Sequence, residues 1–130
     1  MRVFAALFLL TLLAGCTSYA SRTYGTPAPA RGKVLLANGQ PARGLRVIFT
    51  PTDGQGYQDF ADTGADGTFA FGAGGQGPQG VVPGHYVVLF EKSPNARAAA
   101  AVPRKFTDTD TSIKVEVKAG EDNVFAFRLQ

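Results

Sequence analysis

Cysteine and histidine are almost absent from this sequence, which contains one of each, Cys16 and His85. A single cysteine cannot form an internal disulfide. Cys16 also lies in a short N-terminal segment, far in sequence from His85, so the inventory excludes a Cys–His nucleophile pair and a histidine-rich zinc site. We therefore expect no catalytic residue, no metal site and no cofactor.

Tryptophan is missing and charge is weak, whereas glycine and proline are abundant. The net charge is +3, too small to indicate the clustered basic face of a nucleic-acid-binding protein. The 16 glycines and 8 prolines favour many turns and short strands over long helices. A glycine-rich stretch, Gly72 to Gly80, lacks the following Lys-Ser/Thr and the flanking strand and helix of a phosphate-binding loop. We expect no nucleotide ligand.

The N-terminus has a short apolar segment where a membrane-spanning helix would need a longer one. Arg2 is followed by Val3 to Ala14, in which only Thr11 is polar. Twelve residues fall short of the roughly 20 that span a bilayer. A charged start, a short apolar core and small residues after it are typical of a secretory signal peptide.

The end of this segment reads Leu13-Ala14-Gly15-Cys16 and resembles the lipobox of bacterial lipoproteins. The resemblance implies cleavage before Cys16, a diacylglyceryl group on its thiol and an acylated new amine, which would anchor the protein on the extracytoplasmic side of a membrane. Thr17 in place of an Asp favours the outer membrane in a Gram-negative envelope. An ordinary secreted protein with a free cysteine and a cytosolic domain with a buried one are the alternatives.

Three segments follow from these patterns: a signal peptide over 1–15, a lipidated tether over 16–30 and a folded domain over 31–130. The tether is rich in Pro, Ser and Thr and shows no hydrophobic period, which favours an extended or disordered chain. In extended form about 15 residues reach roughly 45 Å.

The remaining hundred residues predict an all-β domain with seven short strands. Alternating or continuous apolar residues, separated by turn dipeptides, mark each strand. The run from His85 to Phe90 is apolar on both faces, which indicates a central strand. The last two strands are predicted to form a hairpin, and only Ala98 to Ala101 suggests a helix. An antiparallel Greek-key sandwich buries such one-sided strands. The predicted strands cover 33–37, 44–51, 57–63, 68–71, 85–90, 113–117 and 125–129.

Five motifs in order resemble the carboxypeptidase regulatory-like, or transthyretin-like, sandwich family. They include Gly39 to Gly44, Asp66 to Phe69 and Pro83 to Val88, whereas Lys33 departs slightly from the family's opening Gly-x-Val. The resemblance covers roughly residues 31–130 and implies an immunoglobulin-like sandwich. Its motif residues specify turns and imply no chemistry. The predicted turn residues are Gly39, Pro41, Gly44, Asp66, Gly67, Pro83 and Gly84.

Three groups of residues are weaker candidates for binding. His85 is expected to be an ordinary strand residue facing solvent or a neighbouring sheet. The acids of two loop regions include oxygen ligands of the kind calcium uses, but their spacing is typical of solvated turns. The segment from Lys92 to Lys105 has four basic residues and no acid, and could contact an anionic head group or cell-wall polymer. The acids are Asp53, Asp59, Asp62, Asp66, Asp108 and Asp110; the bases are Lys92, Arg97, Arg104 and Lys105.

The sequence as a whole predicts a non-catalytic, lipid-anchored envelope lipoprotein that acts as a structural or binding module. Its partners would be the membrane, through acylated Cys16, and an unidentified envelope protein or polysaccharide; we expect a monomer. One alternative is a secretion-system-associated outer-membrane lipoprotein. Another is a small hydrolase related to transthyretin, but those enzymes use several histidines and end in Tyr-Arg-Gly-Ser, whereas this chain ends in Phe-Arg-Leu-Gln.

Overall fold

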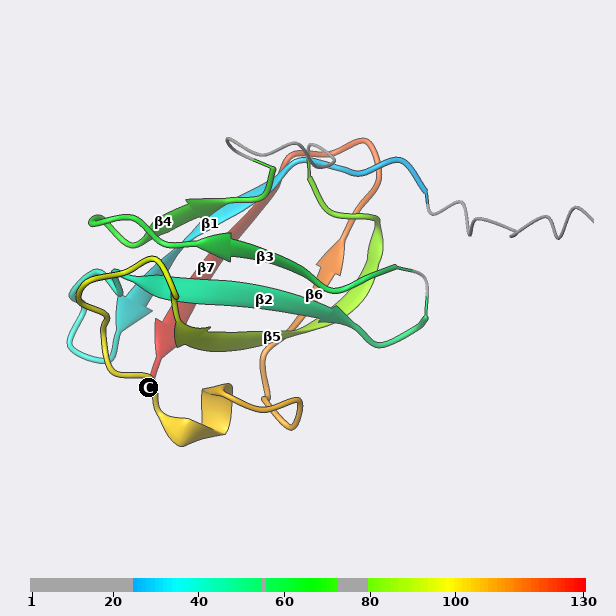
Figure 1. Cartoon of the computed structure of the whole chain (residues 1–130). Helices are drawn as coiled ribbons and strands as arrows, with labels where there is room; N and C mark the ends of the chain where they lie inside the picture. Colours follow the sequence, from blue (N-terminus) through cyan, green and yellow to red (C-terminus); the bar gives the residue numbers. More distant parts are fainter. Residues whose placement is uncertain (1–24, 55, 73–79) are drawn as a thin grey trace, which may run out of the picture.

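A computed structural model of the chain describes residues 25–54, 56–72 and 80–130, which form two β-sheets packed face to face (Figure 1). The described residues contain seven strands, no α-helix and one 3₁₀ turn, η1 (Arg104–Phe106). Ala98 to Ala101, the predicted helical spot, has no regular structure. The strands are β1 (Ala30–Leu36), β2 (Leu45–Pro51), β3 (Asp59–Asp62), β4 (Thr68–Ala70), β5 (Gly84–Lys92), β6 (Lys114–Val117) and β7 (Asn123–Leu129).

The larger sheet has four antiparallel strands in the order β3-β2-β5-β6. Strand β5 lies inside the sheet, which confirms the prediction of a central strand. Its residues Val87 and Leu89, on the face turned away from the other sheet, are only 7% and 8% exposed. Burial on both faces therefore explains the continuous apolar run from Tyr86 to Phe90.

The smaller sheet has three strands in the order β4-β1-β7, and one of its two pairings is parallel. The prediction of a wholly antiparallel sandwich is therefore wrong for the β1–β7 pair, which runs in register from Ala30–Asn123 to Leu36–Leu129. Both strands start at the same end of the molecule. The pairing joins the first strand to the last.

The predicted hairpin between the last two strands is also wrong, because β6 pairs with β5 and β7 pairs with β1. The turn at residues 118–122 carries the chain from one sheet to the other. Asn123 stabilises this crossing: its Oδ1 accepts the Lys118 N–H at 2.9 Å, and its Nδ2 donates to the Lys118 and Pro29 carbonyls at 3.1 Å. Alternation marks two one-sided strands, but it does not identify their partners.

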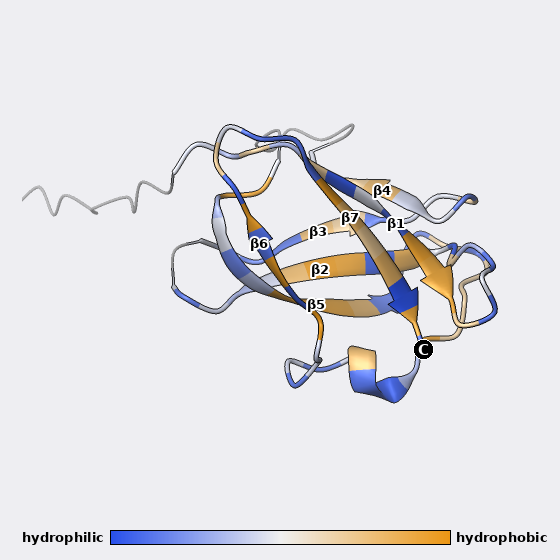
Figure 2. Ribbon diagram, turned by 180° about the vertical axis from the view of Figure 1, so that it is seen from behind, coloured by the Kyte–Doolittle hydropathy of each residue, from blue (hydrophilic) through white to orange (hydrophobic). Residues whose placement is uncertain are grey.

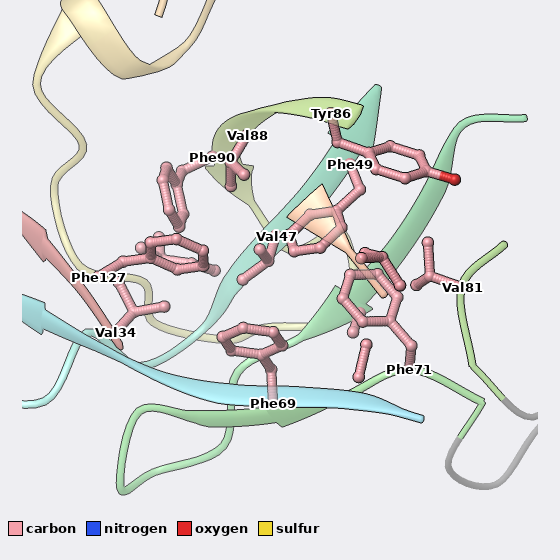
Figure 3. Close-up of a cluster of buried hydrophobic side chains, with 14 of the residues drawn as sticks. Val34, Val47, Phe49, Phe69, Phe71, Val81, Tyr86, Val88, Phe90 and Phe127 are labelled. Atoms are coloured by element: carbon pink, nitrogen blue, oxygen red, sulfur yellow. The ribbon is translucent and has the colours of Figure 1, made fainter. Parts of the chain in front are cut away.

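The core lies between the sheets and is dominated by phenylalanine (Figure 3). Phe49 of β2 is fully buried, and its ring centroid lies 4.7 Å from that of Phe71 and 5.4 Å from that of Phe125. The rings of Tyr86 and Phe127 lie within 6.4 Å of it. Phe49 thus joins the aromatic side chains of both sheets into one cluster.

The first described strand starts slightly before the predicted domain boundary at residue 31. Ala28 and Val81 exchange backbone hydrogen bonds of 2.8 and 2.9 Å, and both side chains are buried. Ala30 is the first residue of β1 and is 3% exposed. Composition alone could not indicate the bridge between Ala28 and Val81.

The alternating strand directions give the sandwich two distinct ends. We name the end where the described chain starts the N-terminal end, and the opposite one, which carries η1 and Gln130, the distal end (Figure 1). The N-terminal end comprises residues 25–29, 52–54, 56–58, 71–72, 80–83 and 118–122; the distal end comprises residues 37–44, 63–67, 93–113 and 130.

Candidate functional site

A groove of about 1180 Å³ is lined by parts of both sheets. Strand β3 is an edge of the larger sheet and β4 an edge of the smaller one, and both line it. The lining includes glycine, alanine and aromatic residues together with several charged side chains. These residues include Lys33, Arg46, Tyr57, Asp59, Phe60, Asp62, Thr68, Phe69, Ala70, Val124 and Phe125.

An exposed aromatic ring is the most distinctive feature of this groove. Phe60 is 54% exposed, although most large apolar residues of the domain are buried. The register of β2 and β3 places Arg46 opposite Asp62 and Ile48 opposite Phe60. The Arg46 guanidinium carbon lies 4.1 Å from the Phe60 ring centroid. A guanidinium over an aromatic face is a stabilising cation–π contact.

The same guanidinium also makes an ion pair with Asp62. Arg46 Nε donates to Asp62 Oδ1 at 2.9 Å and Nη2 donates to Oδ2 at 3.3 Å. These hydrogen bonds hold the pKa of the Asp62 carboxyl below its usual value. Arg46 is thus fixed in place. Phe60 is left as a flat apolar surface beside a neutralised charge pair, an arrangement suited to contact with an apolar or aromatic group of a partner.

Asp59 adds a partly buried carboxyl to the groove. It starts β3, and burial raises the pKa of this carboxyl, although its Oδ1 accepts the Phe60 N–H at 2.9 Å. Such a group takes up a proton more readily than a solvated aspartate. It gives the groove a negative charge that weakens at acid pH.

His85 lies at the N-terminal end, outside this groove. Its Nδ1 is 3.5 Å from Asp53 Oδ2, and its side chain is 65% exposed. A histidine–carboxylate pair can orient a base, but acyl transfer also needs a nucleophile within hydrogen-bond reach. The nearby hydroxyl of Thr52 is directed to the His85 carbonyl oxygen, at 3.2 Å. The pair is therefore an exposed surface contact in this structure.

Tyr86, the next residue, turns into the core, where its hydroxyl donates to the Val82 carbonyl. Burial, followed by the nearby negative charge of Asp53, raises the pKa of Tyr86 to about 12. A phenol that ionises so far above neutral pH is not suited to act as a base. Its role is to hold the 80–83 segment against β5.

Asp59 and Asp62 both line the groove, but the fold separates the other loop acids. Asp53 lies near His85, Asp62 pairs with Arg46, and Asp66 Oδ1 accepts the N–H and hydroxyl of Thr68 at 3.1 and 2.7 Å. Asp108 and Asp110 lie in the distal 107–113 segment. Within the described ranges, no three His, Cys, Asp or Glu side chains are grouped closely enough to hold a metal ion.

The predicted turn residues lie in turns or at strand starts. The backbone φ is positive at Gly39, Gly44, Gly67 and Gly84. At Gly44 a Cβ would collide with the Ala98 carbonyl oxygen, and at Gly67 it would lie 2.5 Å from that of Val34. The other motif residues are Pro41, which bridges to Leu35, Asp66, which bonds Thr68, and Pro83, which precedes β5.

Basic side chains gather at the distal end. Arg43 and Arg97 line a shallow hollow of about 340 Å³ beside Thr63 and Ala98. Arg104 and Lys105 form part of η1, and Lys92 ends β5. The basic segment identified in the sequence is therefore a distal loop. The fold adds Arg43 to it from another loop.

Sequence patterns did not identify the Arg46–Phe60–Asp62 cluster, because it depends on the register of β2 and β3. The only signal was the sequence Asp59-Phe60-Ala61-Asp62, in which an aromatic residue shares a strand face with an acid. The lipobox residues Leu13, Ala14, Gly15 and Cys16 lie outside the described residues.

Comparisons of the chain with protein-family models, with curated proteins and with solved structures find no match. Of the residues that the structure describes, none belongs to a helix long and apolar enough to cross a membrane.

Proposed function

We propose that this protein is a lipid-anchored lipoprotein of the bacterial cell envelope, with a sandwich that serves as a non-catalytic structural or binding module. The observation that carries the proposal is Leu13-Ala14-Gly15-Cys16, which ends a short apolar segment at the only cysteine of the chain. Thiol and amine acylation supply more than one lipid chain, and stable membrane anchoring requires at least two such signals.

The shape of the domain is compatible with this role. The described chain enters at the N-terminal end, so a tether from Cys16 would leave the groove and the distal loops accessible (Figure 1). The exposed ring of Phe60 offers a contact surface for an envelope protein, and the distal arginines Arg43 and Arg97 offer one for an anionic polymer. With Thr17 after the cysteine, the outer membrane is the favoured location in a Gram-negative cell.

The domain itself is proposed to be a transthyretin-like sandwich of the carboxypeptidase regulatory-like type. Seven strands in two sheets and the turn glycines Gly44 and Gly67 support this assignment. The secretion-system lipoprotein remains the alternative within binding proteins. A hydrolase is disfavoured, because His85 is exposed and the Thr52 hydroxyl is bonded to a backbone carbonyl.

The anchor is tested by metabolic labelling with a radioactive or clickable palmitate in the bacterium that expresses the full chain. The wild type is expected to incorporate label and to sediment with membranes. Cys16→Ser should lose the label and appear in the soluble extracytoplasmic fraction, whereas Ser18→Ala should behave as wild type. Retention of label by Cys16→Ser would refute the lipoprotein assignment.

The absence of catalysis is tested separately with the purified protein and panels of ester and amide substrates. We expect no turnover above the uncatalysed rate. Turnover that disappears in His85→Ala but persists in Tyr57→Phe would favour the hydrolase instead.

A further inference from the structure

The four edges of the two sheets are protected to very different degrees. Exposed edges invite pairing with other strands, and proteins usually shorten or charge them. Strand β3 has four residues, two of them aspartate; β4 has three residues; β6 has four, including Lys114 and Glu116. Strand β7 has seven residues, of which Arg128 is the only charged one. It is the unprotected edge of the sandwich.

The free hydrogen-bonding groups of β7 can be assigned from its pairing with β1. The Asn123 N–H donates to the Pro29 carbonyl at 2.9 Å, so Asn123 faces β1. Because successive residues of a strand point their N–H and C=O groups to opposite sides, Val124, Ala126 and Arg128 present theirs to the open edge. No strand covers that side among the residues that the structure describes. The side chains of these three residues are also exposed.

We propose that the open edge of β7 binds β7 of a second copy of this chain, antiparallel and centred on Ala126. In this register Ala126 faces its own counterpart, and Val124 faces Arg128 of the second copy. All three edge residues of each chain then form hydrogen-bonded pairs, and the two three-stranded sheets become one continuous six-stranded sheet. Figure 2, which views the molecule from behind, shows β7 and β1 in front of the larger sheet.

Side-chain chemistry favours this register over its neighbours. Phe125 would lie opposite Phe127 of the second copy at a non-hydrogen-bonded position, where cross-strand side chains are closest. Phe125 is only half-buried in the single chain, and its ring already lies 5.9 Å from that of Phe127, so the pairing extends an existing aromatic stack. A register centred on Arg128 would instead place two guanidinium groups opposite each other, which is destabilising.

One pair of strands buries less area than a stable interface between proteins in dilute solution. Confinement of both copies to one membrane by acylated Cys16 would raise their effective concentration, and this step rests on the proposed function. The sequence prediction of a monomer and the proposed dimer give opposite outcomes in the experiments below. The palmitate labelling of Cys16→Ser reports on the anchor alone, so the two proposals can fail independently.

The first experiment is disulfide cross-linking of the full chain in cells, with a mild oxidant and a non-reducing gel. In an antiparallel hydrogen-bonded pair the Cα atoms are about 5.5 Å apart, within the range that a disulfide spans. Ala126→Cys should therefore give a band of twice the monomer mass. Val124→Cys is the control, because the two Val124 Cα atoms would be four residues, or roughly 14 Å, apart.

The double variant Val124→Cys/Arg128→Cys should form the same dimer again, because those two positions face each other across the axis. Equal cross-linking of Val124→Cys and Ala126→Cys would overturn the register. The absence of a dimer with Ala126→Cys, or a product whose mass indicates a different protein, would overturn the pairing with a second copy.

The second experiment changes charge instead of adding a thiol. Ala126→Lys would place two like charges opposite each other on the axis and should weaken self-association of the full-length protein in membrane vesicles up to about fivefold, measured by energy transfer between fluorescently labelled copies. Ala70→Lys, an exposed alanine on β4 of the same sheet, should leave association unchanged. Both variants should unfold at the wild-type temperature. Equal weakening by the two lysines, or by neither, would contradict the proposal.

Discussion

The two sheets of this sandwich are assembled from different kinds of strand pair. In the larger sheet, β3 follows β2 and β6 follows β5, so two of its three strand pairs join strands that are consecutive in sequence. In the smaller sheet, β1 pairs with β7 from the other end of the domain. The larger sheet can therefore form from local segments. The smaller one closes only after the whole domain has been made, because its β1–β7 contacts span the longest sequence separation.

The sheets depend on each other through the aromatic core and through the segments that cross from one sheet to the other. Phe49 belongs to the larger sheet, yet the rings of Phe71, Phe125 and Phe127 contact it from the smaller one. Along the described strands, the chain changes sheet after β1, after β3, after β4 and after β6. Substitutions in the core and in these crossing segments test whether the smaller sheet depends on contacts with the other sheet more than the larger sheet does.

The largest effect is expected from Phe49→Ala, which would empty the space where the two sheets meet. Loss of a buried phenylalanine costs about 3–5 kcal/mol of unfolding free energy. Phe60→Ala, on the neighbouring strand, should cost about 1 kcal/mol or less, because that ring is 54% exposed and contacts Arg46 at the surface. Urea denaturation of both variants measures the difference. Similar losses would show that the core is not organised around Phe49.

A smaller loss is expected from Gly67→Ala in the crossing from β3 to β4. Gly67 has φ +76°, and a Cβ there would lie 2.5 Å from the Val34 carbonyl oxygen of β1. Left-handed backbone and overpacking together should cost about 2–4 kcal/mol.

Gly39→Ala, in the connection from β1 to β2, is the matched control for close packing, since Gly39 has φ +84° and nothing within 4 Å of its Cβ position. It should cost only about 1–2 kcal/mol. If Gly67→Ala and Gly39→Ala are equally destabilising, the close approach of residue 67 to β1 contributes nothing to the cost of the Gly67 substitution. The measurement is the thermal unfolding of both variants beside the wild type.

The positions of the strands could be predicted from the sequence, but their partners could not. Alternation at Phe125 and Phe127 correctly marked a strand with one buried face. The same alternation is satisfied by any partner of the right length. The prediction of a β6–β7 hairpin failed because β1 offered β7 a seven-residue edge, whereas β6 has four residues.

The candidate site, like the strand pairing, could be predicted from the sequence only in part. From the composition we expect neither a metal site nor a nucleotide ligand. The basic distal segment can be found in the sequence as a run without acidic residues. The Arg46–Phe60–Asp62 cluster was not visible, because it exists only in the register that pairs Arg46 with Asp62. Likewise, the unprotected edge of β7 follows from its place in the sheet order, which no local pattern contains.

The crossing from β6 to β7 should be sensitive to Asn123→Ala, which removes the side chain that joins residues 118–122 to Pro29. Buried backbone groups that lose hydrogen-bond partners cost about 1–3 kcal/mol. Asn38→Ala should cost less, because its Oδ1 makes one exposed hydrogen bond, to the Gln40 N–H at 3.0 Å. Hydrogen exchange sharpens the comparison: Asn123→Ala should increase exchange in β1 and β7 more than in β2 and β5. Uniform acceleration across both sheets would contradict it.

The smallest effects concern an Arg–Asp pair on each sheet. Arg46–Asp62 in the larger sheet has side chains 17% and 32% exposed, whereas Arg31–Asp122 at the smaller sheet has side chains 60% and 52% exposed. In both, the hydrogen bond from arginine lowers the pKa of the aspartate. A lowered pKa stabilises the fold above the unfolded value of about 3.9, and this stability is lost as pH falls through the folded value.

Asp62→Asn should therefore cost at most about 1 kcal/mol at neutral pH, and its unfolding free energy should approach that of wild type as the solution is acidified below the unfolded pKa. Asp122→Asn should follow the wild-type pH profile throughout, because solvent screens an exposed pair. The measurement is the unfolding free energy of all three proteins from neutral to acid pH at low and high salt. A pH-dependent loss in Asp122→Asn as large as that in Asp62→Asn would mean that the exposed pair holds the β1–β7 end of the smaller sheet as firmly as Arg46–Asp62 holds β2 to β3.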